Sequence, residues 1–166
     1  MGRFTHFDDE GGARMVDVSG KADTVREAVA GCTVKMKPGT LRLILDGKVE
    51  KGDVLGVARV AGIMAAKQTG YLVPMCHPLD ITAAEIEFYP DNTRSCLDIE
   101  SRVRIVGKTG VEMEALTAAA LAALTIYDMC KAVDREIVIG ELRLVKKSGG
   151  KSGTFVRGAQ RSESSG

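Results

Sequence analysis

Hydrophobic and charged residues alternate most regularly over residues 95–106. The apolar positions there are Leu97, Ile99, Val103 and Ile105, and the charged positions are Asp98, Glu100, Arg102 and Arg104. A period of two is that of a β-strand, and a strand with one charged side belongs to a sheet that has one face in water. Residues 81–89 alternate in the same way, and the intervening Pro90-Asp91-Asn92 is typical of a turn. The two segments together predict a β-hairpin.

The sequence predicts two more strands and a long helix. Residues 24–36 alternate with period two and predict a strand. An Ala- and Leu-rich stretch, roughly 112–133, has the length and composition of a helix. A last strand is expected from Ile137 to about Lys146.

Two helices are expected between the first strand and the hairpin. Pro38 suits the first position of a short helix, which Asp46-Gly47 would end. Asp53 is a typical N-cap residue for a second helix, which Gly70 is expected to close. This second helix is rich in Gly and Ala. Because small side chains let another backbone come close, we expect it to be buried against a sheet or a second subunit.

The resulting order of elements is β-α(α)-β-β-α-β. It predicts an α+β, ferredoxin-like βαββαβ fold, with a four-stranded antiparallel sheet and helices on one face. A chain of 166 residues favours a single domain, which we expect over residues 14–147. Residues 1–13 and 148–166 are polar or rich in Gly and Ser, so flexible termini are predicted there.

The charge balance narrows the classes of partner. The formal net charge is +1, whereas domains that bind nucleic acid are usually strongly basic. An RNA-recognition module has the same βαββαβ order, but it needs aromatic residues on a central strand, and residues 95–106 contain no Phe, Tyr or Trp. We therefore expect no nucleic-acid partner. A small anion held by a local cluster of cations stays compatible with this charge.

The cysteines and the apolar segments indicate a cytoplasmic protein. The four cysteines are Cys32, Cys76, Cys96 and Cys130. They form no CxxC pair and are expected to be free thiols. The N-terminal residues have no apolar stretch typical of a signal peptide, and the apolar segment 54–66 is too short to span a bilayer. We expect no membrane partner.

Two groups on the long helix can carry chemistry. Asp128 and Lys131 are three residues apart, so they can meet either as an ordinary surface ion pair or as an acid/base pair at a cleft. Glu112-Met113-Glu114 begins the helix, where carboxylates favour the helix dipole. One of these carboxylates could instead accept two parallel N–H groups from a guanine-like edge. The spacing leaves both alternatives open in each case.

His77 is held in the run Pro74-Met75-Cys76-His77-Pro78, where two prolines favour an extended loop. It is either an ordinary solvated or buried histidine, or a phosphate ligand or proton donor. Adjacent Cys and His are poor chelators of one metal ion, so no metal site is predicted.

The run Lys146–Ser152 resembles part of a P-loop. However, Val145 stands where the first glycine of that motif is needed, and no helix follows the strand. A Walker-type NTPase is therefore excluded, although a flexible Gly-Lys segment can still fold over an anion.

Several segments together carry a resemblance to a known family. They are Met15–Ser19 with Lys21, Thr24–Ala28, Lys51–Val54, Ala58–Lys67, Met75–Leu79, Gly110–Leu116, Tyr127–Lys131 and Lys147–Gly153. In this order, over residues 14–153, they are similar to the cyclic pyranopterin monophosphate synthase family, also called MoaC.

The resemblance implies a lyase of molybdenum cofactor biosynthesis. Its substrate would be 3′,8-cyclo-7,8-dihydro-GTP, its product cyclic pyranopterin monophosphate, and its leaving group pyrophosphate. It also implies a ferredoxin-like homohexamer, a trimer of dimers with active sites at subunit interfaces, and a pathway partner, the radical-SAM GTP cyclase that supplies the substrate. No cofactor is required, and Mg²⁺ on the triphosphate is compatible with this chemistry.

The same resemblance assigns roles to particular residues. Lys51, Asp128 and Lys131 are expected to carry the proton transfers of the rearrangement. Glu112, Met113 and Glu114 would hold the base. His77, Lys67 and Lys147 would surround the triphosphate, and Met75, Cys76 and Arg26 are further candidates for substrate binding. A non-catalytic, oligomeric ligand-binding domain is the alternative, and it would have no need of Lys51, Asp128 and Lys131 together.

Overall fold

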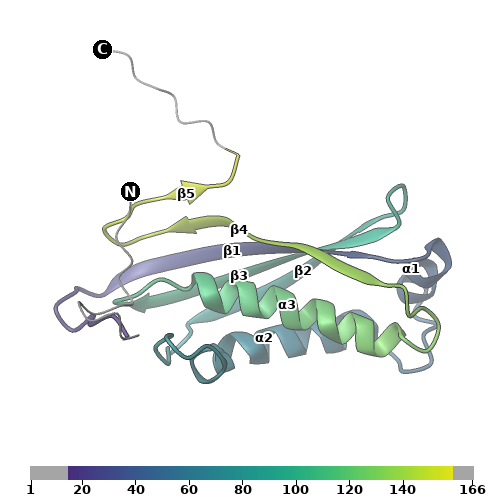
Figure 1. The fold of residues 1–166 in the computed structure, drawn as a ribbon, viewed down its shortest axis with the longest axis horizontal. Coiled ribbons are helices and arrows are strands. Elements are labelled where there is room, and N and C mark those ends of the chain that lie inside the picture. Colours follow the sequence, from purple (N-terminus) through teal and green to yellow (C-terminus); the bar gives the residue numbers. More distant parts are fainter. Residues whose placement is uncertain (1–14, 159–166) are drawn as a thin grey trace, which may run out of the picture.

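One antiparallel sheet carries two long helices on a single face (Figure 1). The computed structural model describes residues 15–158. Its elements are β1 (Thr24–Lys35), α1 (Pro38–Leu45), α2 (Val54–Leu72), β2 (Ala83–Asp91), β3 (Cys96–Gly107), α3 (Glu112–Cys130), β4 (Val138–Ser148) and β5 (Phe155–Val156).

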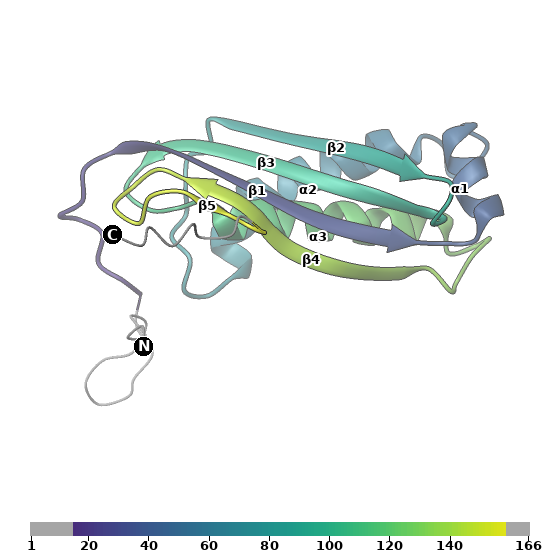
Figure 2. The same cartoon turned by 90° about the horizontal axis from the view of Figure 1, so that it is seen from above.

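The strand order is β2-β3-β1-β4-β5, and every neighbouring pair is antiparallel (Figure 2). Strand β3 therefore lies between β1 and β2, which is the arrangement of the split βαβ unit. The α+β, ferredoxin-like prediction is confirmed. The sheet has five strands rather than the four that the sequence pattern predicts.

The fifth strand comes from a segment that was predicted to be flexible. After β4, Gly149 and Gly150 adopt φ values of 92° and 73°, which only glycine reaches easily, and the chain turns back. Phe155 and Val156 then pair with Lys147 and Lys146 of β4. Residues 148–158, for which a flexible terminus was predicted, thus contain the end of β4, a turn and the short strand β5, whereas residues 1–13 and 159–166 lie outside the described part of the chain.

The hairpin between β2 and β3 is confirmed, but its turn lies two residues later than predicted. Pro90 and Asp91 belong to β2, and the turn spans residues 92–95. Strand β2 is at the edge of the sheet, where a proline costs no ladder hydrogen bond. The Asp91 carboxylate then closes the turn by accepting the backbone N–H of Arg94 at 2.9 Å.

The core lies between the sheet and helix α3. The buried helical residues are Ala115, Ala118, Ala119, Ala122, Ala123 and Ile126, and they face the even-numbered residues of β1 and the apolar row of β3. Ser101 of β3 is fully buried, and its hydroxyl donates to the carbonyl of Ala115 at 2.6 Å. By length and composition α3 is the one described helix that could cross a membrane, but here it is the central helix of this core.

Helix α2 packs its small residues mainly against α3, and it also contacts strand β2 of the sheet. A side chain at Gly62 would lie 3.0 Å from the carbonyl oxygen of Ala118 on α3. Asp53 is confirmed as the N-cap, since its carboxylate accepts the N–H of Gly56 at 2.9 Å. Gly70 does not end the helix, which continues to Leu72. Its hydrogen side chain instead makes room for the segment at Pro78.

The opposite face of the sheet is charged, as the alternation in β3 predicts. The Glu27 carboxylate lies 3.1 Å from Arg102, 3.5 Å from Arg104 and 3.6 Å from Lys146. Val29, whose strand neighbours are Arg102 and Lys146, is only 2% exposed on this face. This face is therefore a network of ion pairs over a thin apolar layer.

Candidate active site

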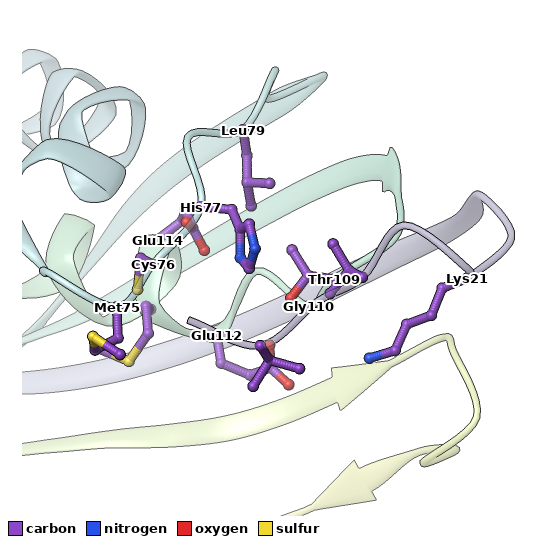
Figure 3. A pocket seen from close by; sticks show the side chains of 12 residues that line it. Lys21, Met75, Cys76, His77, Leu79, Thr109, Gly110, Glu112 and Glu114 are labelled. Atoms are coloured by element: carbon purple, nitrogen blue, oxygen red, sulfur yellow. The ribbon is translucent and has the colours of Figure 1, made fainter. Parts of the chain in front are cut away.

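A pocket of about 270 Å³ lies at the N-terminal end of α3 (Figure 3). It is bounded by the first turn of that helix, by the segment after α2 and by the chain before β1. The residues that line it are Val16, Val18, Lys21, Met75, Cys76, His77, Leu79, Thr109, Gly110, Glu112, Met113 and Glu114. Six of the predicted substrate-binding residues, from Met75 to His77 and from Glu112 to Glu114, thus meet around one cavity.

The position of His77 follows from how α2 ends. The N–H of Cys76 donates to the carbonyl of Val73 at 3.0 Å, which turns the chain back toward the helix. A Cβ atom at Gly70 would lie 2.7 Å from the Cα of Pro78, so the loop rests directly on the last turn of α2. Figure 3 shows the imidazole of His77 and the ammonium group of Lys21 directed from different segments into the same pocket.

Glu114 is a buried carboxyl group in the wall of the pocket. Its side chain is in the first turn of α3 and the residue is only 4% exposed. Burial raises its pKa to about 7, and the nearby Glu112 carboxylate adds a smaller effect in the same direction. Burial, with a further contribution from Glu114, also raises the pKa of the Cys76 thiol. Glu114 can therefore give or take a proton near neutral pH.

Cations extend the pocket on the side of β1 and β4. Lys21 and Glu112 also line an adjacent cavity of about 170 Å³, together with Arg26 and Lys147. The Arg26 guanidinium is held by the carbonyls of Gly107 and Lys108, at 2.9 and 3.0 Å. The Lys147 ammonium donates to the hydroxyl of Ser152, in the turn that leads to β5. An anion in the first pocket would thus meet three positive side chains at its border.

A second cluster lies at the other end of α3. The Asp128 carboxylate is 2.7 Å from the ammonium of Lys131 and 3.1 Å from that of Lys51. The Lys51 ammonium also donates to the Asp128 backbone carbonyl at 2.9 Å. Hydrogen bonds from Lys131 and then Lys51 hold the pKa of Asp128 below its usual value, and Asp128 in turn raises the pKa of Lys131. The three residues predicted to transfer protons are therefore in direct contact.

The two clusters are far apart within one chain. Glu112 and Asp128 are separated by 128 − 112 = 16 residues of continuous helix. A rise of 1.5 Å per residue places them about 24 Å apart. This distance is greater than the length of a small substrate molecule, so one bound molecule could not contact both clusters. One chain alone does not bring all the predicted site residues together.

Lys67 belongs to neither cluster. It is exposed on α2 and lines none of the cavities described above. Within residues 15–158 it forms no ion pair. Lys67 is therefore not positioned to contact a triphosphate bound in the pocket of its own chain.

Several residues that line the pocket were not predicted from the sequence. Val16 and Val18 come from the chain before β1, and Thr109 and Leu79 come from loops. Irregular segments carry no periodic pattern, so local spacing does not show which surface they cover, although Val16, Val18 and Leu79 lie in segments that carry the family resemblance. Lys21 belonged to a segment of the family resemblance, but no role was predicted for it.

Comparison with known proteins extends these observations. The model of the MoaC family matches residues 15–150. The chain belongs to the MoaC family. Among the MoaC relatives, a protein of Pelotomaculum thermopropionicum is 65% identical over 157 residues, which cover 95% of this chain and 92% of the relative. One of Heliobacterium modesticaldum is 60% identical over 95% of this chain and 99% of its own length. Both are named cyclic pyranopterin monophosphate synthase.

The geometry of the two clusters bears on the alternatives that the sequence left open for their residues. The Asp128–Lys131 pair is not an isolated surface pair, because Lys51 joins it from a distant part of the chain. The carboxylate of Glu114 is not merely a helix-end charge, because it is buried in a pocket wall. Within residues 15–158, no group of three or more His, Cys, Asp or Glu side chains is placed to hold a metal ion.

The close approach at Gly70 generates a stability prediction. A methyl group there would overlap the Pro78 backbone, so Gly70→Ala is expected to lower the free energy of unfolding by about 1–3 kcal/mol. Gly39→Ala is the matched control, since that helical glycine has nothing within 4 Å of its Cβ position. It should change stability by at most about 1 kcal/mol. Urea unfolding compares the two, and equal effects would contradict the close approach.

Glu114 generates a pH-dependent prediction. Its carboxyl has a pKa of about 7 when folded and about 4.5 when unfolded, so the folded state holds more protons between these values. Wild-type stability should therefore fall relative to Glu114→Gln as the pH rises from about 4.5 to about 7, by at most about 3 kcal/mol. Unfolding midpoints measured across this range test it. A constant difference between the two proteins would show that Glu114 titrates normally.

Proposed function

We propose that this protein converts 3′,8-cyclo-7,8-dihydro-GTP to cyclic pyranopterin monophosphate and releases pyrophosphate. The relatives in the MoaC family carry the name of this synthase, and the proposal extends that activity to the present chain. The observation that carries it is the pocket at the start of α3, where carboxylates suited to a guanine-like edge lie beside cations suited to phosphates.

The base of the substrate would lie against the first turn of α3. The Glu112 carboxylate can accept two parallel N–H groups of a guanine ring. Met75 and Met113 supply apolar contacts for its faces. Glu114, with its pKa near 7, can donate a proton to the ring or remove one as the purine is opened and rebuilt.

The triphosphate would extend toward the neighbouring cations. His77 and Lys21 lie in the first pocket, and Arg26 and Lys147 lie in the adjoining one. Positive charge on Lys21, Arg26 and Lys147 would stabilise the leaving pyrophosphate as the cyclic phosphate closes, and the His77 imidazole could donate a hydrogen bond to it. We expect no resident metal cofactor, and a Mg²⁺ ion that accompanies the triphosphate would be bound through phosphate oxygens.

The distance between the two clusters supports a site shared by two copies of the chain. Lys51, Asp128 and Lys131 would reach a substrate held in another copy's pocket, and Lys67 could contribute in the same way. A two-fold dimer would create two such sites, because each copy would give one cluster and receive the other. This agrees with the expected trimer of dimers. The expected cytoplasmic location and the radical-SAM partner that supplies the substrate belong to the same proposal.

Loss of Lys51 tests the activity. Lys51→Ala removes one of two cations that contact Asp128, so formation of pterin and pyrophosphate should fall by about 10²-fold or more. Lys48→Ala is the matched control: Lys48 is three residues away and pairs only with the exposed Asp46 within the described chain. It should keep wild-type activity. If the folded, assembled wild-type protein forms neither product, the synthase proposal is wrong and the alternative of a non-catalytic ligand-binding protein remains.

Mixing two inactive variants tests the shared site. His77→Ala damages the pocket, and Lys51→Ala damages the distant cluster. In a dimer that carries one copy of each, one of its two sites combines both undamaged clusters. Unfolding and refolding an equal mixture should therefore restore about a quarter of wild-type activity. If the mixture reassembles but recovers no activity, the two clusters that act on one substrate belong to the same chain.

A further inference from the structure

Asp134 is a buried charge that neither cluster of the proposed site uses. It follows the last turn of α3 and is only 2% exposed. We propose that Asp134 is a positioning residue, which sets the Lys51–Asp128–Lys131 cluster by tying the end of α3 to the start of α1. The inference rests on the proposed function only where it concerns turnover.

The contacts of Asp134 join two segments that are distant in sequence. Its Oδ2 atom accepts the N–H of Lys37 at 2.9 Å and the hydroxyl of Thr40 at 3.0 Å. Its Oδ1 atom accepts the N–H of Glu136 at 3.1 Å. Lys37 is the N-cap residue of α1, and its side chain makes no cap hydrogen bond. Asp134 thus accepts, from another segment, the N–H of the N-cap residue, a donor for which the helix itself has no acceptor.

Asp134 is fixed to the part of α3 that carries the cluster. The N–H groups of Val133 and Asp134 both donate to the carbonyl of Cys130, at 2.9 and 3.0 Å. This tight turn begins at Lys131 and leaves little freedom between Asp134 and Asp128. Burial opposes the charge on Asp134, but the hydrogen bonds from Lys37, Thr40 and Glu136 outweigh it and keep its pKa below the usual value.

From Lys37, the chain continues through α1 and the turns after it to Lys51. Tight turns follow the helix: Lys48 donates its N–H to Leu43 at 2.9 Å, and Gly52 donates to Val49 at 2.9 Å. Val49 is buried, at 8% exposure. The segment from Lys37 to Lys51 is therefore attached to the same end of α3 at both of its ends, once by Asp134 and once by Asp128.

The two attachments differ in strength. The Lys51–Asp128 pair is exposed to water, and exposed pairs hold geometry weakly. The Asp134 carboxylate is itself buried and its hydrogen bonds are directional, with Thr40 only 4% exposed. Without Asp134, the loop that carries Lys51 would be placed by the exposed pair and by the packing of α1. The pocket at the far end of α3 would be unaffected.

The experiment compares Asp134→Ala with three variants. Asp134→Asn keeps an oxygen that can accept from Lys37 and Thr40, and Thr40→Val removes a single bond to the carboxylate. Glu136→Ala is the surface control, because that side chain is 78% exposed and pairs with Lys37. Steady-state kinetics and the unfolding midpoint are measured for each. The rate at which an N-hydroxysuccinimide ester acetylates Lys51 is measured by mass spectrometry, with Lys67 as internal reference.

Positioning predicts a split between the kinetic constants. In Asp134→Ala, kcat should fall by about tenfold or more while KM stays within about twofold, since the geometry of one cluster is lost and the pocket is kept. Asp134→Asn should recover most of kcat, Thr40→Val should be intermediate, and Glu136→Ala should match wild type. In a Lys51→Ala background, Asp134→Ala should lower kcat no further.

Acetylation separates this inference from the proposed function. Lys51 should be acetylated several-fold faster in Asp134→Ala and Thr40→Val than in wild type, whether or not the wild type turns over substrate. Unchanged acetylation in these folded variants would overturn the inference, and so would equal losses in Asp134→Asn and Asp134→Ala. If Asp134→Ala does not fold, Thr40→Val and Asp134→Asn decide by the same criteria.

Discussion

The close packing of α3 is the constraint on which the rest of the structure depends. Its alanine residues let the helix approach the sheet on one side and α2 on the other. A larger side chain at these positions would push the layers apart, because protein interiors are packed without spare volume. Both candidate clusters include residues of this helix, one cluster at each end. Its rigidity therefore sets the distance between them.

The two ends of α3 provide opposite electrostatic settings. At the N-terminal end, Glu114 is buried and its pKa is raised, so a proton can be held there near neutral pH. At the C-terminal end, Asp128 is exposed, surrounded by two ammonium groups, and stays ionised. Cations are also favoured at a helix C-terminus by the helix dipole. In the proposed site shared by two copies, a carboxyl that can exchange a proton near neutral pH would lie on one side of the substrate and a charged network on the other.

The sheet has a supporting role that follows from its two unlike faces. Its apolar face holds α3, and Ser101 fixes the helix along the strand direction through the Ala115 carbonyl. Its charged face, around Glu27, is an ion-pair network whose Lys146 precedes the cationic Lys147 on β4. The turn at Gly149 and Gly150 lies directly against Arg26. The segment that resembled part of a P-loop is thus an ordered turn that lines the cavity next to Arg26 and Lys147.

Local pattern determined most of the fold. Alternation in β3, the Asp53 cap and the Ala-rich stretch of α3 each depend on neighbours along the chain, so their elements are found where the sequence predicts them. Family motifs also identified Met75 to His77 and Glu112 to Glu114, which meet in one pocket.

Contacts between distant residues were decided only by the tertiary structure. The role of Gly70 depends on Pro78 lying against α2, and the fifth strand depends on a pairing partner in β4. The contribution of Asp134 depends on the start of α1 lying beside the end of α3. The contact of Lys51 with Asp128 likewise depends on the segment after α1 lying beside the end of α3. Sequence records which residues are present and their local periods, but non-local contacts arise only when packing brings separate elements together.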